Sequence, residues 1–502
     1  MTGWRTALFS MLIASAACST DFTPQQCSED GDCGTGLVCE LRETKPACVN
    51  ASDAPLTIGE SAPVSGTNQA LGTAMKLGID RAFDEKNAIG GIRGRMLKLS
   101  FRDDAYQPQL AEAAAKALVD VQVASTTPRC PSTATKAMFD QVPQPVSTTR
   151  LNRGPNAVLA ILGNVGTPTM LRSAPVAIET GTVFFGAFTG SSTILRDSEA
   201  GDECSRFIFN VRASYSQEAQ ATMEYFVTKR HITDSANLIS FDQNDSFGQS
   251  GYDGLIAAYK NTVGPFPSTA DPTKPIHRAR YERNDDTSVP TQVTDVENYL
   301  DTRLHDNPLA MEIHIGIMMT DTYGAGAQFI QALRTWQYTS TDRKRLKLWF
   351  SNVSFVGANS LSDQLKAAGA VPGAPANTFF TDDVVISQVV PNYQSDSSEV
   401  VTSYNKLIKD NGDTPSFTSL EGYIAARVFI AGLELHKGPF TADSIVDSFE
   451  GLPDLGLGIG ATSGFSTKNH QYSNSVWGTV LQPDGSFKNL YFWSVGIPID
   501  FF

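Results

Sequence analysis

The segment from Leu56 to Pro108 decides the fold, and it reads LTIGESAPVSGTNQALGTAMKLGIDRAFDEKNAIGGIRGRMLKLSFRDDAYQP. A short apolar run opens it, and a loop rich in glycine, serine and proline follows. Apolar residues then recur at every fourth position, which places them on one face of a helix: Leu71, Met75, Ile79 and Phe83. After a glycine-rich break, an alternating pattern predicts a strand: Leu97, Leu99 and Phe101. The order β-loop-α-β is one unit of a parallel α/β sheet.

The same alternation of strand and helix patterns continues almost to the end of the chain. One continuous apolar run, Ala157 to Leu162, is typical of a strand that is covered on both faces. A single sheet would need about a dozen strands, which is more than open sheets usually hold. With 502 residues, the chain is also too long for one ordinary core. We therefore predict an α/β protein of two lobes, each a parallel sheet with helices on both faces.

The composition is that of an ordinary globular protein, with 41% hydrophobic and 18% charged residues. The formal net charge is −14 at pH 7. Such a chain is poorly suited to nucleic acids or to an anionic membrane surface, because both repel negative charge. We therefore expect no nucleic-acid partner, and the acidic surface itself indicates no more than solubility.

The first residues indicate export. A single arginine precedes an apolar run from Ala7 to Ala17, which is too short to span a membrane and suits a signal peptide over residues 1–17. Small residues before Cys18 resemble a bacterial lipobox, in which the cysteine carries lipid. Cleavage after Ala17 without lipidation is the alternative, because Ser15 stands where a lipobox usually has an aliphatic residue. We expect an exported protein, periplasmic or at the cell surface, that is anchored to the membrane through Cys18.

Six further cysteines fit an oxidising compartment. Four of them lie in a Gly- and Asp-rich segment that is too small for an apolar core: Cys27, Cys33, Cys39 and Cys48. Two disulfides are favoured over a zinc site, the alternative, because structural zinc ligands usually come in closely spaced pairs. The other two, Cys130 and Cys204, lie in polar loops, and we expect them to bond each other. Residues 18–55 are thus predicted to form a Cys-rich segment and a linker.

Two motifs of the opening segment resemble those of the periplasmic binding proteins of the branched-chain amino-acid type. One is the G-x-x-x-P-x-S/T-G start from Gly59 to Gly66, and the other is the G-G-I-x-G-R turn from Gly90 to Arg95. The resemblance extends from Leu56 to Phe487. It implies two Rossmann-like lobes with doubly wound parallel sheets, joined by three hinge crossovers. Such proteins bind small solutes in a cleft between the lobes and catalyse nothing.

The resemblance also implies where the chain crosses between the lobes. The three crossings fall near Asn210, from Val384 to Pro391 and from Gly456 to Ser466. Each lobe is then built from separate segments. The first lobe would comprise residues 56–209 and 388–458, and the second lobe residues 210–387 and 459–502.

Signatures of catalysis are scarce in the sequence. There is no G-x-S-x-G, Walker or H-E-x-x-H motif, and the six histidines show no metal-ligand spacing. The run Gly456 to Gly460 lacks the βαβ context of a dinucleotide loop and is better explained as a flexible crossover. We therefore predict that the protein is not an enzyme and has no metal or cofactor.

Loops at the carboxyl ends of strands are the candidate binding site, since open α/β sheets bind ligands there. Residues 163–169 combine glycine with a helix start, where unpaired N–H groups and the positive dipole end favour an anion. The threonine of this loop, Thr167, either caps the helix or bonds a ligand oxygen. In the family, this loop and the next hold the carboxylate of an amino acid. Thr167, Thr189 and Gly190 match these holding positions, and Asn164 and Gly166 of the first loop are further candidate ligand-binding residues.

Loops of the second lobe match the family's cleft as well. The matches are Tyr215 in V-R-A-S-Y, Phe247 in N-D-S-F-G, Tyr323 in T-D-T-Y-G, and Ser354. In amino-acid binders an acidic residue at the position of Ser354 pairs with the ligand's ammonium group. Because a buried ammonium without a countercharge is costly, the serine predicts a preference for carboxylates over simple zwitterionic amino acids.

The sequence therefore predicts an extracytoplasmic protein that captures a small polar ligand, amino-acid-like or a carboxylate, between two closing lobes. It would deliver this ligand to an ABC-type permease. Closure provides the signal, because the ligand shifts the balance between an open and a closed state. The alternative on the same fold is a ligand sensor or a surface module that contacts a protein partner.

Overall fold

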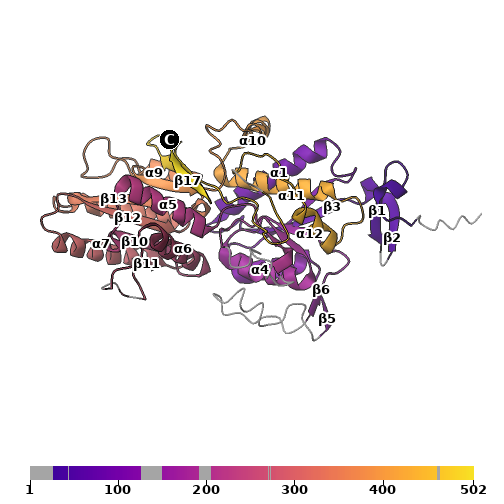
Figure 1. Ribbon diagram of the computed structural model, residues 1–502, viewed down its shortest axis with the longest axis horizontal. Helices are drawn as coiled ribbons and strands as arrows, with labels where there is room; N and C mark the ends of the chain where they lie inside the picture. Colours follow the sequence, from indigo (N-terminus) through magenta and orange to yellow (C-terminus); the bar gives the residue numbers. More distant parts are fainter. Residues whose placement is uncertain are drawn as a thin grey trace, which may run out of the picture.

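The computed structural model describes residues 26–42, 45–125, 150–191, 205–268, 271, 273–460 and 464–502. The predicted signal peptide (residues 1–17), Cys18, Cys130 and Cys204 lie outside these residues. Two lobes lie side by side along the longest axis, and the Cys-rich segment extends from the far end of one of them (Figure 1). Within the described ranges, no helix is both long enough and apolar enough to cross a membrane.

Lobe 1 is built on a parallel sheet whose described strands follow the order β4-β3-β7-β8-β9. These strands are β3 (Leu56–Ala62), β4 (Leu97–Asp103), β7 (Ala160–Leu162), β8 (Val183–Phe185) and β9 (Ile208–Phe209). The helices of the lobe are α1 (Gln69–Ala88), α2 (Pro108–Leu118), α4 (Thr167–Thr180), α10 (Glu399–Asp410), α11 (Phe417–Leu435) and α12 (Ala442–Glu450). Helix α1 packs against α11, and α2 packs against α4. A two-stranded antiparallel sheet of β5 (Gln122–Ser125) and β6 (Arg150–Asn152) also belongs to this lobe.

The opening segment folds as its pattern predicts. The helical face of α1 is buried, with Leu71, Met75, Ile79 and Phe83 all at most 3% exposed. Strand β3 lies inside the sheet between β4 and β7, whereas β4 forms the edge. The edge position explains why Leu99 remains only partly buried. The strand–helix–strand unit thus forms the side of lobe 1 that is farthest from β9.

Lobe 2 is built on a larger mixed sheet, ordered β11-β10-β12-β13-β14-β15-β16-β17. The parallel strands are β10 (Leu238–Gln243), β11 (His277–Tyr281), β12 (Ile313–Thr320), β13 (Leu346–Asn352) and β14 (Val384–Gln388). The antiparallel strands are β15 (Val476–Leu481), β16 (Phe487–Ser494) and β17 (Ile497–Phe501). The helices are α5 (Tyr215–Arg230), α6 (Ser246–Thr262), α7 (Val289–Asp306), α8 (Tyr323–Gln337) and α9 (Ala358–Ala368). Helix α5 packs against α6, and α8 packs against both α7 and α9.

One strand is shorter than its sequence indicates. The apolar pattern from Phe379 to Val390 predicts one long strand, but only β14 is extended. A turn occupies the first part, because the Asp382 carboxylate accepts a hydrogen bond from the Phe379 N–H group (2.8 Å) and Asp383 adopts a left-handed conformation (φ 53°). Local side-chain bonding to the backbone overrides the β-propensity of the neighbouring residues here.

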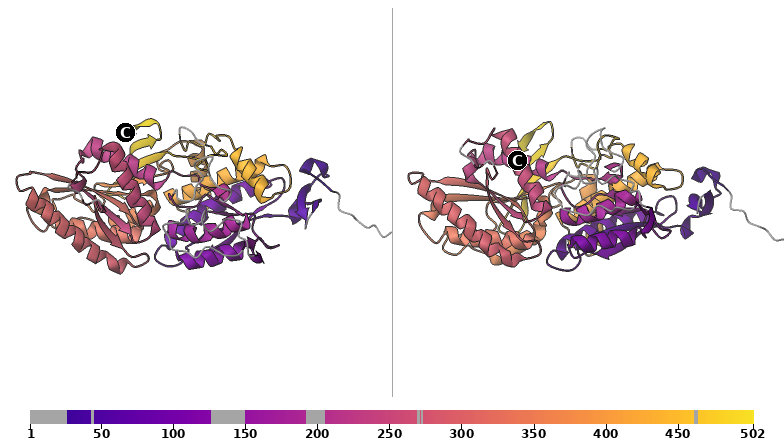
Figure 2. Two further views of the ribbon diagram at one scale, coloured as in Figure 1. Left: turned by 60° about the horizontal axis from the view of Figure 1, so that its bottom comes forward. Right: turned by 90° about the horizontal axis from the view of Figure 1, so that it is seen from below.

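The chain passes between the lobes three times: after β9, after β14 and after α12. The first and third crossovers lie side by side. The Asn210 N–H group donates to the His470 carbonyl oxygen (2.9 Å), and the Tyr472 N–H group donates to the Asn210 carbonyl oxygen (2.8 Å). The last strands, drawn in yellow, lie near this junction in both views of Figure 2. The fold is therefore the two-lobed, three-crossover α/β architecture that the resemblance implies.

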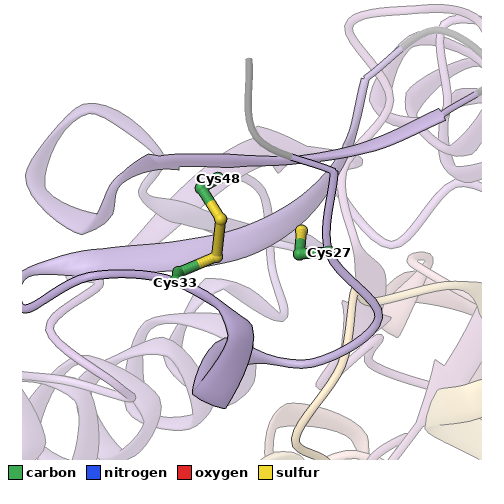
Figure 3. A group of neighbouring side chains, drawn as sticks. All are labelled: Cys27, Cys33 and Cys48. Carbon is green, nitrogen blue, oxygen red and sulfur yellow. A yellow bond between two sulfur atoms is a disulfide. The ribbon is translucent and has the colours of Figure 1, made fainter.

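The Cys-rich segment forms an antiparallel hairpin of β1 (Leu37–Arg42) and β2 (Lys45–Asn50). Two disulfides, Cys27–Cys39 and Cys33–Cys48, hold it together. The Cys33–Cys48 bond lies next to Cys27 (Figure 3). The four sulfur atoms are bonded to one another in pairs and are not thiolate ligands, so the disulfide interpretation is confirmed over the zinc alternative.

The hairpin is attached to lobe 1 by specific contacts. Arg93 of lobe 1 pairs with Asp30 (2.7 Å), and its guanidinium lies 4.3 Å from the centre of the Phe440 ring. The Asp30 N–H group donates to the Lys437 carbonyl oxygen (3.0 Å). These contacts tie the segment to the end of lobe 1 that lies away from lobe 2 (Figure 1).

Candidate functional site

The predicted site residues lie where the two lobes meet, a contact region that we call the seam. Strands β7 and β9 of lobe 1 and strands β10 and β12 of lobe 2 all end at it. Each is followed by a helix that starts at the seam, namely α4, α5, α6 and α8. Helices α4 and α6, from different lobes, are in contact there. The carboxyl ends of the strands and the positive ends of these helix dipoles therefore converge on one region.

A cluster of hydroxyl groups forms the first part of the seam. The hydroxyls of Thr167 and Thr189 share a hydrogen bond (2.7 Å), and Thr189 Oγ1 lies 3.3 Å from the Tyr215 hydroxyl. The Ser191 N–H group donates to Thr189 Oγ1 (3.2 Å). All four residues are at most 1% exposed. We call these residues the hydroxyl corner, and it brings three of the predicted site residues into contact.

Two glycines make room for this cluster. Gly166 has a φ of 99°, and a Cβ atom added there would lie 2.3 Å from the Tyr106 ring. A Cβ atom at Gly190 would lie 2.6 Å from the Tyr215 ring. Gly166, not Thr167, is the N-cap of α4. The Thr167 side chain thus bonds Thr189 and does not cap its helix, and its bond to a ligand oxygen stays a prediction.

Aromatic rings from both lobes fill the space beside the hydroxyl corner. The Phe355 ring of lobe 2 lies 5.0 Å from the Phe188 ring and 6.1 Å from the Tyr106 ring, both of lobe 1. Phe247 packs against Phe355 (4.7 Å) and Tyr215 (5.3 Å). Ring pairs at such distances attract each other beyond the effect of burial alone. Phe247, a predicted site residue, therefore packs against Tyr215, which was also predicted, and belongs to a cluster with three rings that the sequence did not indicate: Phe355, Phe188 and Tyr106.

Tyr106 reaches the seam through an unusual backbone. Both Ala105 (φ 49°) and Tyr106 (φ 58°) are left-handed, a conformation that is costly for residues other than glycine. Buried Asp104 holds this turn, because it accepts hydrogen bonds from the Tyr106 N–H group (2.9 Å) and the Ser61 hydroxyl (2.7 Å). Burial raises the pKa of Asp104 to about 6. The strain positions Tyr106 so that its hydroxyl meets Gln243 of lobe 2 (3.4 Å).

Asn164 lies at the end of β7 and is fully buried. Its amide nitrogen donates to the Ser61 carbonyl oxygen (3.0 Å). Its Oδ1 atom has no hydrogen-bond partner among the described residues. Because a buried polar atom without a partner is costly, this oxygen is suited to accept a hydrogen bond from a ligand.

Ser354 lies in a second part of the seam, where charges are paired. Arg212 Nη2 donates to Glu218 Oε1 (2.7 Å) and to the Ser354 hydroxyl, and Arg212 Nη1 donates to Glu421 Oε1 (3.1 Å). Glu218 also accepts hydrogen bonds from the Ser354 N–H group (2.7 Å) and the Ser387 hydroxyl (2.6 Å). We call these residues the charged corner. Ser354 thus has an acidic neighbour after all, Glu218 of α5, and Arg212 pairs with both this carboxylate and that of Glu421 on α11.

The charged corner is deeply buried and joins the two lobes. The side chains of Arg212 and Glu218 are 1% and 0% exposed, and that of Glu421, which belongs to α11 of lobe 1, is 9% exposed. Burial raises the pKa of Glu421 to about 7, although the Arg212 charge opposes this shift. The Arg212 guanidinium also lies 5.7 Å from the centre of the Tyr215 ring, so the two corners share Tyr215.

Tyr323 is the first residue of α8 and lies at another part of the seam. Its hydroxyl donates across the seam to the Thr67 carbonyl oxygen of lobe 1. Next to it, the Asn68 amide donates to Asn284 Oδ1 of lobe 2 (2.8 Å). These contacts hold the loop after β3 against lobe 2. Tyr323 therefore bridges the lobes and is separate from the hydroxyl corner.

Comparison with known families decides the identity of this fold. The family model described as periplasmic binding protein matches residues 55–145 and 155–486. The chain belongs to this family. Its matches place it with the type I periplasmic binding proteins of the branched-chain amino-acid type. It is therefore a binding protein and not an enzyme.

Individual relatives of this periplasmic binding protein agree with the assignment. Leu/Ile/Val-binding protein homolog 3 of Brucella melitensis is 39% identical over 70 residues, which cover 14% of this chain and 19% of the relative. The crystal structure of a possible leucine/isoleucine/valine-binding protein from Rhodopirellula baltica shares 28% identity with a TM-score of 0.66, over 88% of this chain and 98% of that one. A fatty acid ABC transporter substrate-binding protein from Thermomonospora curvata shares the fold at 15% identity, with a TM-score of 0.60 over 87% of this chain and 92% of that one.

Proposed function

We propose that this periplasmic binding protein captures a small polar ligand, amino-acid-like or a carboxylate, between its two lobes and delivers it to an ABC-type transporter. The hydroxyl corner is the observation that carries this proposal. It offers hydrogen-bonding groups at the carboxyl ends of strands, beside the start of α4, in a buried position between two lobes. Such a place is where open α/β sheets hold ligands.

The ligand-binding residues that we propose are those predicted from the sequence. The Thr189 hydroxyl contacts the hydroxyls of Thr167 and Tyr215. A ligand oxygen can therefore replace one of these hydroxyls as a hydrogen-bond partner. The remaining positions flank them or bridge the lobes, and they are Asn164, Gly166, Gly190, Phe247, Tyr323 and Ser354. Side chains from both lobes would thus surround the ligand.

The proposed mechanism is closure around the crossovers. Lobe 1 would comprise residues 56–209 and 388–458, and lobe 2 residues 210–387 and 459–502. Contacts across the seam, such as Tyr323 to Thr67, form only when the lobes are together. A ligand that binds both lobes favours the closed state by its extra contacts there. A transporter can then distinguish the loaded form by its shape.

A thermal-shift screen of the purified mature protein against a metabolite library tests this function. A ligand at about 100 times its dissociation constant stabilises the native state by about 2.7 kcal/mol, which is readily measured as a shift in Tm. We expect hits among small carboxylates or amino-acid-like compounds, and a loss of the shift in Thr189→Val. Thr180→Val is the matched control, because Thr180 is a buried threonine at the other end of α4. The absence of any hit in a broad library would contradict the proposal.

Membrane attachment is proposed through lipid on Cys18, after removal of residues 1–17. Cys18→Ala should release the protein from the membrane fraction, since no other anchor is proposed for the mature protein. Mass spectrometry of the mature N-terminus should find the lipid on the wild type. Retention of Cys18→Ala at the membrane to the same extent would refute the anchor.

The remaining cysteines are proposed to form a third disulfide, between Cys130 and Cys204. Non-reducing peptide mapping should recover this pair together with Cys27–Cys39 and Cys33–Cys48. Recovery of Cys130 or Cys204 as a free thiol would show that the long-range bond does not form.

A further inference from the structure

Ser246 is the first residue of α6, the helix that contacts α4 across the seam. It is 5% exposed, and its hydroxyl forms no hydrogen bond among the described residues. The N-cap residue of the helix, Asp245, already has partners for its side chain. Its carboxylate accepts from the Phe247 N–H group (2.9 Å) and pairs with Arg283 (2.9 Å), which balances its charge. The unpartnered group at the start of α6 is therefore a neutral hydroxyl, free to donate.

A chain of polar contacts leads from Ser246 to the hydroxyl corner of lobe 1. The Ser250 hydroxyl, one turn along α6, lies 2.9 Å from the Ser246 carbonyl oxygen and 3.4 Å from the Ser191 hydroxyl. The Ser191 N–H group in turn donates to Thr189 Oγ1, which bonds Thr167 at the start of α4. The first turns of α4 and α6 thus approach each other across the seam, with hydroxyl groups from both lobes between them.

We propose that Ser246 and Ser250 supply lobe 2's part of the site for a ligand's acid group, and that the ligand is an organic acid without an ammonium group. The inference rests on the proposed solute-binding function and names its ligand class. Hydroxyls of both lobes donate to the acid group, and two helix starts contribute their positive dipole ends. An acid held in this way closes the seam, because its contacts require both lobes.

The charged corner explains why an ammonium group is excluded. In amino-acid binders the ammonium meets an acidic group at the position of Ser354, as described above. Here the guanidinium of Arg212 already bonds Ser354 and both neighbouring carboxylates, Glu218 and Glu421. A ligand ammonium would have to displace a buried arginine whose countercharges are in place. The body of the ligand would instead contact rings such as Phe247 and Phe355, which favours branched or aromatic organic acids.

Calorimetry with four compounds tests both parts of the proposal. α-Ketoisocaproate is leucine with its amino group replaced by a ketone, leucinamide lacks the acid group, and phenylacetate is an aromatic acid without an amine. We expect the wild type to bind at least one of the two organic acids more than tenfold more tightly than leucine, and leucinamide not at all. In Ser246→Ala, affinity for the acid should fall by roughly ten- to a hundredfold, because a hydrogen bond to a charged group is lost.

Stability separates a binding role of Ser246 from a structural one. Removing a buried hydroxyl that has no partner should leave the unfolding midpoint of Ser246→Ala unchanged or higher. Ser362→Ala is the matched control, since Ser362 is a buried serine of α9 that bonds the Gly485 carbonyl oxygen, and its affinity should stay at the wild-type value.

Three results would overturn the inference. Equal affinity of the acid for wild type and Ser246→Ala would remove Ser246 from the site. Binding of leucine as tight as that of the organic acids would reject the ligand class. If none of the four compounds binds, the proposed ligand class is also rejected. The broad metabolite screen then tests the solute-binding function separately.

Discussion

The hydroxyl corner and the charged corner are neighbours in the same seam, yet they differ in what they can do. Tyr215 touches both, with its hydroxyl near Thr189 and its ring near Arg212. In the hydroxyl corner the groups are neutral and can exchange one hydrogen-bond partner for another. In the charged corner each group is fixed by opposite charges or several hydrogen bonds. A ligand can therefore bind in the hydroxyl corner at little cost in free energy. The charged corner instead keeps the two lobes aligned with each other.

The energetic contrast follows from burial. Removing one partner from a buried ion pair leaves an uncompensated charge, which typically costs several kcal/mol. Removing one neutral hydroxyl costs about 1 kcal/mol of stability, but it costs more in binding when the ligand group is charged. The comparison thus predicts stability effects at one corner and affinity effects at the other.

The largest effect is expected at Arg212. Arg212→Met leaves Glu218 and Glu421 buried without their cation, so the free energy of unfolding should fall by about 3–5 kcal/mol in denaturant titration. Arg206→Met is the control, because Arg206 pairs with two well-exposed aspartates, Asp443 and Asp447, and such pairs contribute about 1 kcal/mol or less. Equal losses in the two variants would remove the distinction between the corners.

The pH dependence of stability should report on Glu421. Its pKa rises from an ordinary 4.5 to about 7 in the native protein, so the native state retains a proton that the unfolded chain has lost. Stability from this group is complete below about pH 4.5 and is lost as the pH rises through about 7, by roughly 3 kcal/mol at most. The difference in unfolding free energy between wild type and Glu421→Gln should therefore decline over that range. A constant difference would show that Glu421 is ionised throughout.

Binding should be affected most at the hydroxyl corner. Thr189→Val removes the hydroxyl that contacts Thr167, Tyr215 and the Ser191 N–H group. We expect affinity for an acid ligand to fall by roughly ten- to a hundredfold, with a loss of stability near 1 kcal/mol. Calorimetry and denaturant titration measure the two quantities. A stability loss as large as that of Arg212→Met, with unchanged affinity, would make Thr189 a structural residue.

The smallest effect is expected at Tyr323. Tyr323→Phe removes one hydrogen bond that forms only between closed lobes, so affinity should fall about fivefold through faster dissociation. Stopped-flow dissociation kinetics would detect this change. Unchanged dissociation would indicate that the Tyr323 contact persists in the open state.

Local pattern revealed much of the fold and of the hydroxyl corner. The spacing of Leu71, Met75 and Ile79 was sufficient for α1, and the loops that contain Thr167 and Thr189 follow recognisable strands. The charged corner depends instead on tertiary contacts that no local pattern contains. Glu421 meets Arg212 from 209 residues away.

Two further residues illustrate why the rest of the site was missed. Tyr106 enters the seam only because two consecutive residues adopt left-handed conformations, which the sequence D-D-A-Y does not signal. Ser354 led to the prediction that the family's acidic residue is absent, and this stays a prediction. It did not reveal that the carboxylate of Glu218, on α5 and 136 residues away in the sequence, accepts a hydrogen bond from the Ser354 N–H group.

The distance between the lobes tests the central claim most directly. Lys98 on the edge strand β4 and Thr294 on α7, which packs beside the edge strand β11, are exposed and lie far from the crossovers. Spin labels at these positions, introduced as non-canonical amino acids because the chain has seven cysteines, report the separation by pulsed electron resonance. We predict a broad, longer distance without ligand and a single shorter one at saturation. A distance distribution that is unchanged by a ligand of proven affinity would contradict closure of the two lobes.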